Sequence, residues 1–159
     1  MDIAAILVSQ YLASLDMLRQ AIVAMPESEW DSPQDANRSW QVAYHAIYFV
    51  HEYLWGYSPA EFTYWEKHRP GYEDFDPARP YEPYDKETVL EYLEFCRRLV
   101  RERVPQMDLA AMEGGRDPLF TMLELQIYTI RHIMQHAGEL MERLAARSGA
   151  EVRWVGRGK

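Results

Sequence analysis

The sequence has a single cysteine, Cys96, and no excess of positive charge. One thiol cannot form a disulfide within the chain, and it excludes zinc fingers and Cys-x-x-Cys redox motifs, so we expect a cytoplasmic protein. Seventeen Lys and Arg residues against 25 Asp and Glu residues give a net charge of −8. Phosphate groups would meet net repulsion, and we therefore expect no nucleic-acid partner and no binding to anionic lipid.

Long apolar runs and a basic N-terminal segment are also missing. No run reaches the length of a membrane span, and Met1-Asp2-Ile3 has an acid where a secretory signal has basic residues. We therefore expect no membrane partner. The 159 residues, 48% of them hydrophobic, match the size and composition of one ordinary domain, so we expect residues 1–159 to fold as a single unit.

No stretch alternates polar and apolar residues for long enough to predict a strand, whereas four stretches have the period of a helix. Asp85 and Asp117 are expected caps, and Ser39 is expected to cap the second helix. Pro26 and Pro105 are expected to end the first and third helices. The expected helices cover residues 3–25, 40–56, 86–104 and 118–148.

The connection between the second and third helices, residues 58–85, contains five prolines and cannot be one long helix. Loops of this length either carry function or span a distance. The sequence therefore predicts an all-α four-helix bundle in up-down-down-up order, with a long crossover between helices 2 and 3. Thirteen of the 21 aromatic residues lie between Tyr44 and Tyr84, which suits a pocket wall or a cover packed on the bundle.

Three of the five histidines are expected on helix faces that look into the bundle. His132 and His136 are four residues apart, so both imidazoles lie on one side of the fourth helix, and His45 belongs to the apolar stripe of the second. Three neutral imidazoles suit a divalent metal ion, zinc or nickel first and iron or manganese next, with one position left open. The alternative is a set of ordinary core histidines. His51, about 240° around the helix from His45, and His68 are expected outside this group.

Other kinds of site lack their motifs. There is no Glu-x-x-His pair of the di-iron bundles, no glycine-rich nucleotide loop, and no second histidine after His51-Glu52 to complete a zinc-protease motif. Cys96 lies on the apolar side of the third helix, where a buried and inert thiol is expected. The acidic residues Glu73, Asp74 and Asp76 are expected to form a solvated rim.

Together these features resemble the DinB superfamily of metal-binding four-helix bundles, which includes the YfiT-like enzymes. The resemblance covers nearly the whole chain, in helix order, loop lengths and histidine placement. It rests on the patterns Ser39-Trp40-xxx-Tyr44-His45, Tyr128-xx-Arg131-His132-xxx-His136-xx-Glu139 and Val152-Arg153-Trp154-Val155.

The resemblance implies that His45, His132 and His136 bind a divalent metal ion. Characterised relatives are S-transferases that use bacillithiol, mycothiol or glutathione; one branch isomerises maleylpyruvate, and many members have no known activity. Relatives commonly have Gln three residues after the second histidine of the last helix, whereas this chain has Glu139, a candidate catalytic group. The resemblance also implies a homodimer.

Three functions remain open at this point. The first is a metal-dependent S-transferase that activates a small-molecule thiol for attack on an electrophilic co-substrate. The second is a metal-dependent hydrolase in which Glu139 or Glu52 acts as the base on a water molecule. The third is a non-catalytic metal-binding protein of the stress response. A closed structural site needs four protein ligands, and three histidines favour an open one.

Overall fold

The structure is a computed structural model, which describes residues 1–55, 62–76, 78–112 and 120–158. Every regular element in these ranges is a helix, as the all-α expectation requires. The elements are α1 (Ile3–Ala24), α2 (Glu27–Trp30), α3 (Ser39–Tyr53), α4 (Lys86–Arg103), the 3₁₀-helix η1 (Val104–Gln106) and α5 (Met122–Ser148). Among the described residues, no helix combines the length and the apolarity that a membrane span needs.

Local side-chain caps decide where the long helices begin. The Asp85 carboxylate accepts a hydrogen bond from the Thr88 amide at 2.7 Å, which starts α4 as predicted. Thr121 and Glu124 form a reciprocal capping box that starts α5. The expected cap at Asp117 lies outside the described residues. The expected Ser39 cap is wrong by one position, because Ser39 is already the first residue of α3.

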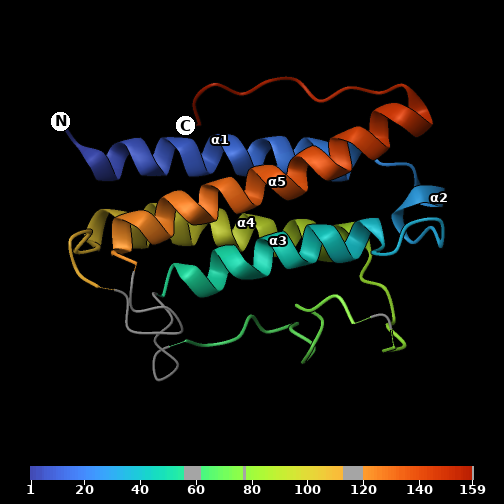
Figure 1. Cartoon of the computed structure of the whole chain (residues 1–159), viewed down its shortest axis with the longest axis horizontal. Helices are drawn as coiled ribbons and strands as arrows, with labels where there is room; N and C mark the ends of the chain where they lie inside the picture. Colours follow the sequence, from blue (N-terminus) through green and yellow to red (C-terminus); the bar gives the residue numbers. More distant parts are fainter. Residues whose placement is uncertain (56–61, 77, 113–119, 159) are drawn as a thin grey trace.

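The four long helices lie side by side (Figure 1), and α5 and α4 each contact both α1 and α3. Their facing sides bury apolar side chains completely, as the periodicity predicts. Buried examples from each helix are Leu15, Ile47, Leu93 and Leu140. The short helix α2 interrupts a segment that was expected to be loop, and it carries the buried Trp30.

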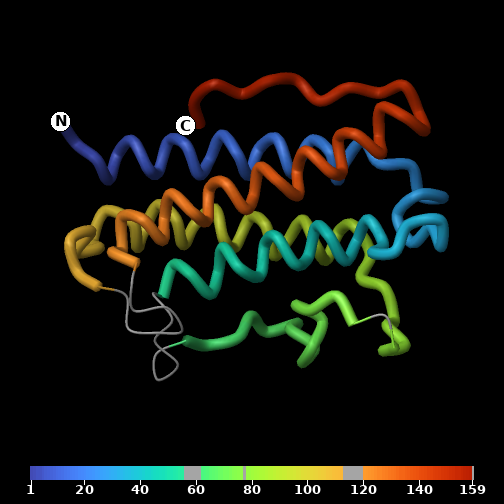
Figure 2. The backbone as a smooth tube through the Cα atoms, viewed as in Figure 1, coloured from blue at the N-terminus to red at the C-terminus, as the bar shows by residue number. Residues whose placement is uncertain are grey.

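The described parts of the 62–85 segment contain no helix and lie along α3 (Figure 2). Aromatic rings attach this segment to the bundle. Trp65 stacks on Tyr92 of α4 with ring centroids 4.4 Å apart, and Tyr84 stacks on Tyr44 of α3 at 4.8 Å. The aromatic-rich stretch therefore acts as a cover over α3, and this cover reaches His45 through Phe75.

The C-terminal segment after α5 turns back and runs along α1 (Figure 2). Its last described residue, Gly158, donates its amide hydrogen to the Ser9 carbonyl at 3.0 Å. A side chain at this position has no room, because a Cβ atom on Gly158 would lie 2.3 Å from the Cβ atom of Leu12 and 2.6 Å from the Ala13 nitrogen. A glycine is thus required for the backbone to approach α1 this closely.

We predict that Gly158→Ala releases the C-terminal segment from α1 while the bundle stays folded. The substitution should raise the rate of carboxypeptidase or trypsin cleavage after residue 150 severalfold and lower the free energy of unfolding by about 1 kcal/mol or less. Gly156→Ala is the matched control, since a Cβ atom there would meet only the Trp154 indole nitrogen, at 3.6 Å. Equal cleavage of the two variants would contradict the prediction.

Candidate metal centre

His45, His132 and His136 converge where α3 and α5 pack against each other. The Nε2 atom of His132 lies 3.2 Å from Nε2 of His45 and 3.1 Å from Nε2 of His136. Three donor atoms of these residues all lie within 4.8 Å of one another and could hold one metal ion. The structure therefore brings together the three histidines that the sequence singled out.

The outward nitrogens of two of these rings have partners that only accept hydrogen bonds. His45 Nδ1 donates to the Glu73 backbone carbonyl at 2.6 Å, and His136 Nδ1 donates to a Glu139 carboxylate oxygen at 3.4 Å. Each Nδ1 atom therefore carries the hydrogen of its neutral ring. It follows that the Nε2 atoms of His45 and His136 both present a lone pair to His132.

Three neutral imidazoles cannot all form hydrogen bonds to one another in this arrangement. A hydrogen on His132 Nε2 can bond to only one of its two neighbours, so the lone pair of the other neighbour has no hydrogen to accept. Protonation would supply more hydrogens, but burial lowers the pKa of His45 to about 4 and that of His132 to about 3. Burial also lowers the pKa of His136, against the opposing effect of Glu139. A metal cation between the three nitrogens resolves the conflict.

The spacing also fits a metal ion. Tetrahedral zinc with Zn–N bonds of about 2.0–2.1 Å separates its nitrogen ligands by roughly 3.3 Å. The two measured Nε2–Nε2 distances, 3.1 and 3.2 Å, are close to that value. All three donor atoms lie within 4.8 Å of one another, so they could share one ion.

Aromatic rings surround the three imidazoles. Phe75 from the cover stacks on His45 with ring centroids 4.2 Å apart, and Phe49 places its ring edge-on against both His45 and His132. Tyr128 lies parallel to His132 at 6.3 Å. Such an apolar shell limits the access of water and lowers the local dielectric constant.

A small hollow of about 100 Å³ approaches His132 from the surface of α5. Its lining is polar, with Tyr128, Arg131 and Gln135 beside His132. A larger cavity, about 1140 Å³, lies elsewhere: it is bordered by Trp55, Trp65 and α4, and it does not touch the three histidines. We take the three histidines as the candidate site because their donor atoms converge. A larger cavity volume alone does not supply such a set of donors.

Glu139 lies next to the centre but on its outer side. One carboxylate oxygen faces His136 Nδ1, the nitrogen that points away from the other two rings, and the second pairs with Arg143. This is the arrangement in which a carboxylate orients a metal-binding histidine and raises its basicity. The contacts of Glu139 thus suit a partner of His136 better than a fourth ligand.

The remaining histidines lie outside the group, as expected. His51 shares a hydrogen bond with the Tyr92 hydroxyl at 2.9 Å, and His68 shares one with the Tyr44 hydroxyl at 2.8 Å. The expectation of a solvated acidic rim was wrong for Glu73, whose side chain is 20% exposed and faces His68 at 3.8 Å. Its burial follows from the packing of the cover on α3.

Three groups that contact the histidines or Glu139 were not identified from the sequence. The Glu73 carbonyl and Phe75 act through the fold of the cover, and neither has a local pattern that would reveal it. Arg143 did have a signal, because His136, Glu139 and Arg143 follow one another at steps of three and four and therefore share a face of α5.

Comparison with known proteins supplies the family. A family model described as the DinB superfamily matches residues 10–140, a range that includes all three histidines and Glu139. No curated protein and no solved structure matches the chain. The match covers most of the sequence. The chain belongs to the DinB superfamily.

Proposed function

We propose that this protein is a metal-dependent S-transferase, which activates a low-molecular-weight thiol and transfers it to an electrophilic co-substrate. The observation that carries the proposal is the convergence of three Nε2 atoms: that of His132 lies 3.1 Å from that of His136 and 3.2 Å from that of His45. We expect zinc or nickel there, and iron or manganese less readily, because neutral imidazole nitrogens are the donors.

The number of donors supports an open site. In the described part of the chain, only these three histidines bring donor atoms together in this way. A structural zinc site has four protein ligands, whereas a catalytic site keeps a position for a small molecule. A divalent ion held there would act as a Lewis acid and lower the pKa of a thiol so that the thiolate is present near pH 7.

The protein itself offers no thiol nucleophile, which supports the use of an external one. Its single cysteine, Cys96, is fully buried and donates its thiol hydrogen to the Ile47 carbonyl at 3.7 Å. Burial raises the pKa of this thiol well above its usual value. In the proposed reaction the external thiol loses its proton to solvent and its sulfur forms a bond to the electrophilic carbon. The leaving group departs with the electron pair of the broken bond.

We propose that Glu139 serves this reaction by holding His136. Its carboxylate accepts the hydrogen of His136 Nδ1 and so directs the Nε2 lone pair toward the centre. The negative charge also lies close to the site, where it disfavours a second anion. The alternative role, a general base acting on water in a hydrolase, requires that Glu139 leave this contact.

We predict that His132→Ala weakens binding of zinc or nickel by at least about 100-fold and leaves the helical circular dichroism unchanged. The fold should persist because a chain of this length buries enough apolar surface without an ion. The measurement is elemental analysis of protein purified without a chelator, with isothermal titration of metal into the stripped protein.

His68→Gln is the matched control, since His68 belongs to the cover and contacts α3 through Tyr44 but lies outside the group of three. It should bind metal with the wild-type stoichiometry of one ion. Loss of helical structure in stripped wild-type protein would instead identify the ion as structural and remove the argument for an open site.

A second prediction separates thiol transfer from hydrolysis. Addition of a small thiol to cobalt-substituted protein should produce a sulfur-to-cobalt charge-transfer band near pH 7. Glu139→Gln should strengthen thiol binding severalfold, because the substitution removes a nearby negative charge and keeps an acceptor for His136. Ester hydrolysis that needs no thiol and falls in Glu139→Gln would contradict the transferase and favour the hydrolase.

We also infer the finer features of the architecture. The course of the 62–85 segment back along α3 and the chain directions visible in Figure 1 support up-down-down-up order, with α3 and α4 parallel. The shared core supports one domain over residues 1–159. The homodimer implied by the family resemblance and the cytoplasmic location inferred from the single cysteine stay predictions; sedimentation analysis tests the dimer.

A further inference from the structure

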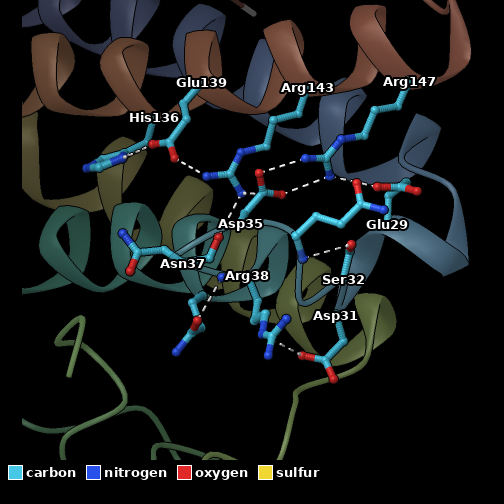
Figure 3. Close-up of polar contacts among 12 residues, drawn as sticks. Glu29, Asp31, Ser32, Asp35, Asn37, Arg38, His136, Glu139, Arg143 and Arg147 are labelled. Carbon is cyan, nitrogen blue, oxygen red and sulfur yellow. Dashed lines mark hydrogen bonds and ion pairs between the residues drawn. The ribbon is translucent and has the colours of Figure 1, made fainter. Parts of the chain in front are cut away.

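A series of ion pairs with alternating charges extends from the candidate metal centre across the surface of α5 (Figure 3). Glu139 pairs with Arg143, and Arg143 Nη1 lies 3.5 Å from an Asp35 carboxylate oxygen. The other Asp35 oxygen accepts a hydrogen bond from Arg147 at 2.7 Å, and Arg147 also reaches Glu29 at 2.6 Å. The series ends at Glu29, which is four ion pairs away from Glu139.

Arg143 has the most buried side chain in this series of ion pairs. Its side chain is 10% exposed, whereas that of Glu139 is 36% exposed and that of Asp35 is 17% exposed. A guanidinium in such a place needs acceptors for its hydrogens. It has three: the two carboxylates and the Asn37 backbone carbonyl, which accepts from Nη1 at 2.9 Å. These contacts leave the guanidinium little freedom to turn.

The fixed guanidinium in turn restricts Glu139. A third of this carboxylate side chain is exposed, and a free glutamate there would rotate into water. Arg143 takes one oxygen, which leaves the other facing His136 Nδ1 at 3.4 Å. Without Arg143 the same carboxylate would be free to leave His136 or to approach the metal ion as an additional anionic ligand.

Arg143 also joins the two sides of the centre. Asp35 and Asn37 belong to the segment that leads directly into α3, the helix that carries His45. Arg143 itself lies on α5, seven residues after His136 and on the same face. One side chain thus connects the start of the His45 helix to the helix of His132 and His136.

We propose that Arg143 is a positioning residue of the metal centre: it holds Glu139 against His136 and ties the Asp35–Asn37 segment to α5, and so sets the affinity and coordination of the bound ion. This inference rests on the proposed metal site and deepens it. Arg147, which shares Asp35 with Arg143 but makes no contact with Glu139, has no such role.

The test compares Arg143→Lys with Arg147→Lys. Both substitutions keep the charge and lose the planar fork, so both should lower the melting temperature of the metal-free protein. Only Arg143→Lys should weaken zinc binding, by about 10- to 100-fold, as loss of an outer-shell partner of a metal ligand typically does. Zinc affinity is measured by competition with a chromophoric chelator, and the cobalt d–d spectrum reports whether the coordination changes.

A double-mutant cycle shows whether the effect passes through Glu139. In the Glu139→Gln background, Arg143→Lys should weaken zinc binding by less than it does in the wild-type background, because the carboxylate that Arg143 positions is gone and only its contacts with Asp35 and Asn37 are left to lose. Equal losses of affinity in Arg143→Lys and Arg147→Lys, or an unchanged cobalt spectrum and affinity in Arg143→Lys, would overturn the inference. Failure of the wild-type protein to bind any divalent ion would overturn the metal site itself. That result is distinguishable from the two outcomes that overturn only the role of Arg143.

Discussion

The rest of the site depends on one constraint, which is that three imidazole nitrogens face one another. Two of the rings direct lone pairs inward because their other nitrogens donate to acceptors, and burial opposes the uptake of protons. Neutral rings leave one of these lone pairs without a hydrogen to accept. The contact between α3 and α5 therefore gathers three donor atoms that could hold a metal cation.

The partners of the outward nitrogens come from different parts of the fold. The cover provides the Glu73 carbonyl for His45, and α5 provides Glu139 for His136. His132 Nδ1 is buried without a hydrogen-bond partner among the described residues. Its ring is held by neighbours of another kind, since Tyr128 lies parallel to it and Phe49 meets it edge-on. The geometry of the centre thus depends on the packing of the cover as much as on the two helices.

The same cover shields the histidines from water, since Phe75 stacks on His45. The single thiol is buried in α4, where it donates to the Ile47 carbonyl. Charged groups near the centre are engaged in pairs that run outward along α5 (Figure 3). A small reactant would therefore meet an ion, aromatic walls and the polar hollow beside His132, which is a suitable setting for activating an external nucleophile.

The sequence alone determined most local features of the protein, although it misplaced the start of α3 by one residue and that of α5, which begins at Met122 and not at residue 118. Helical periodicity predicted the long helices, Asp85 predicted the start of α4, and the four-residue spacing of His132 and His136 predicted a shared face. These features depend on residues within one or two helical turns. The inward position of His45 was also predictable, because an apolar stripe identifies the side of a helix that packs.

Only the tertiary structure decided which nitrogen of each ring points inward and what holds it there. His45 meets His132 across 87 residues, and Arg143 meets Asn37 across 106. Two of the deciding groups, the carbonyls of Glu73 and Asn37, belong to the backbone, which is the same at every residue and leaves no pattern in the sequence. Their positions arise when the cover packs on α3 and α5 packs beside it, and no local rule contains that information.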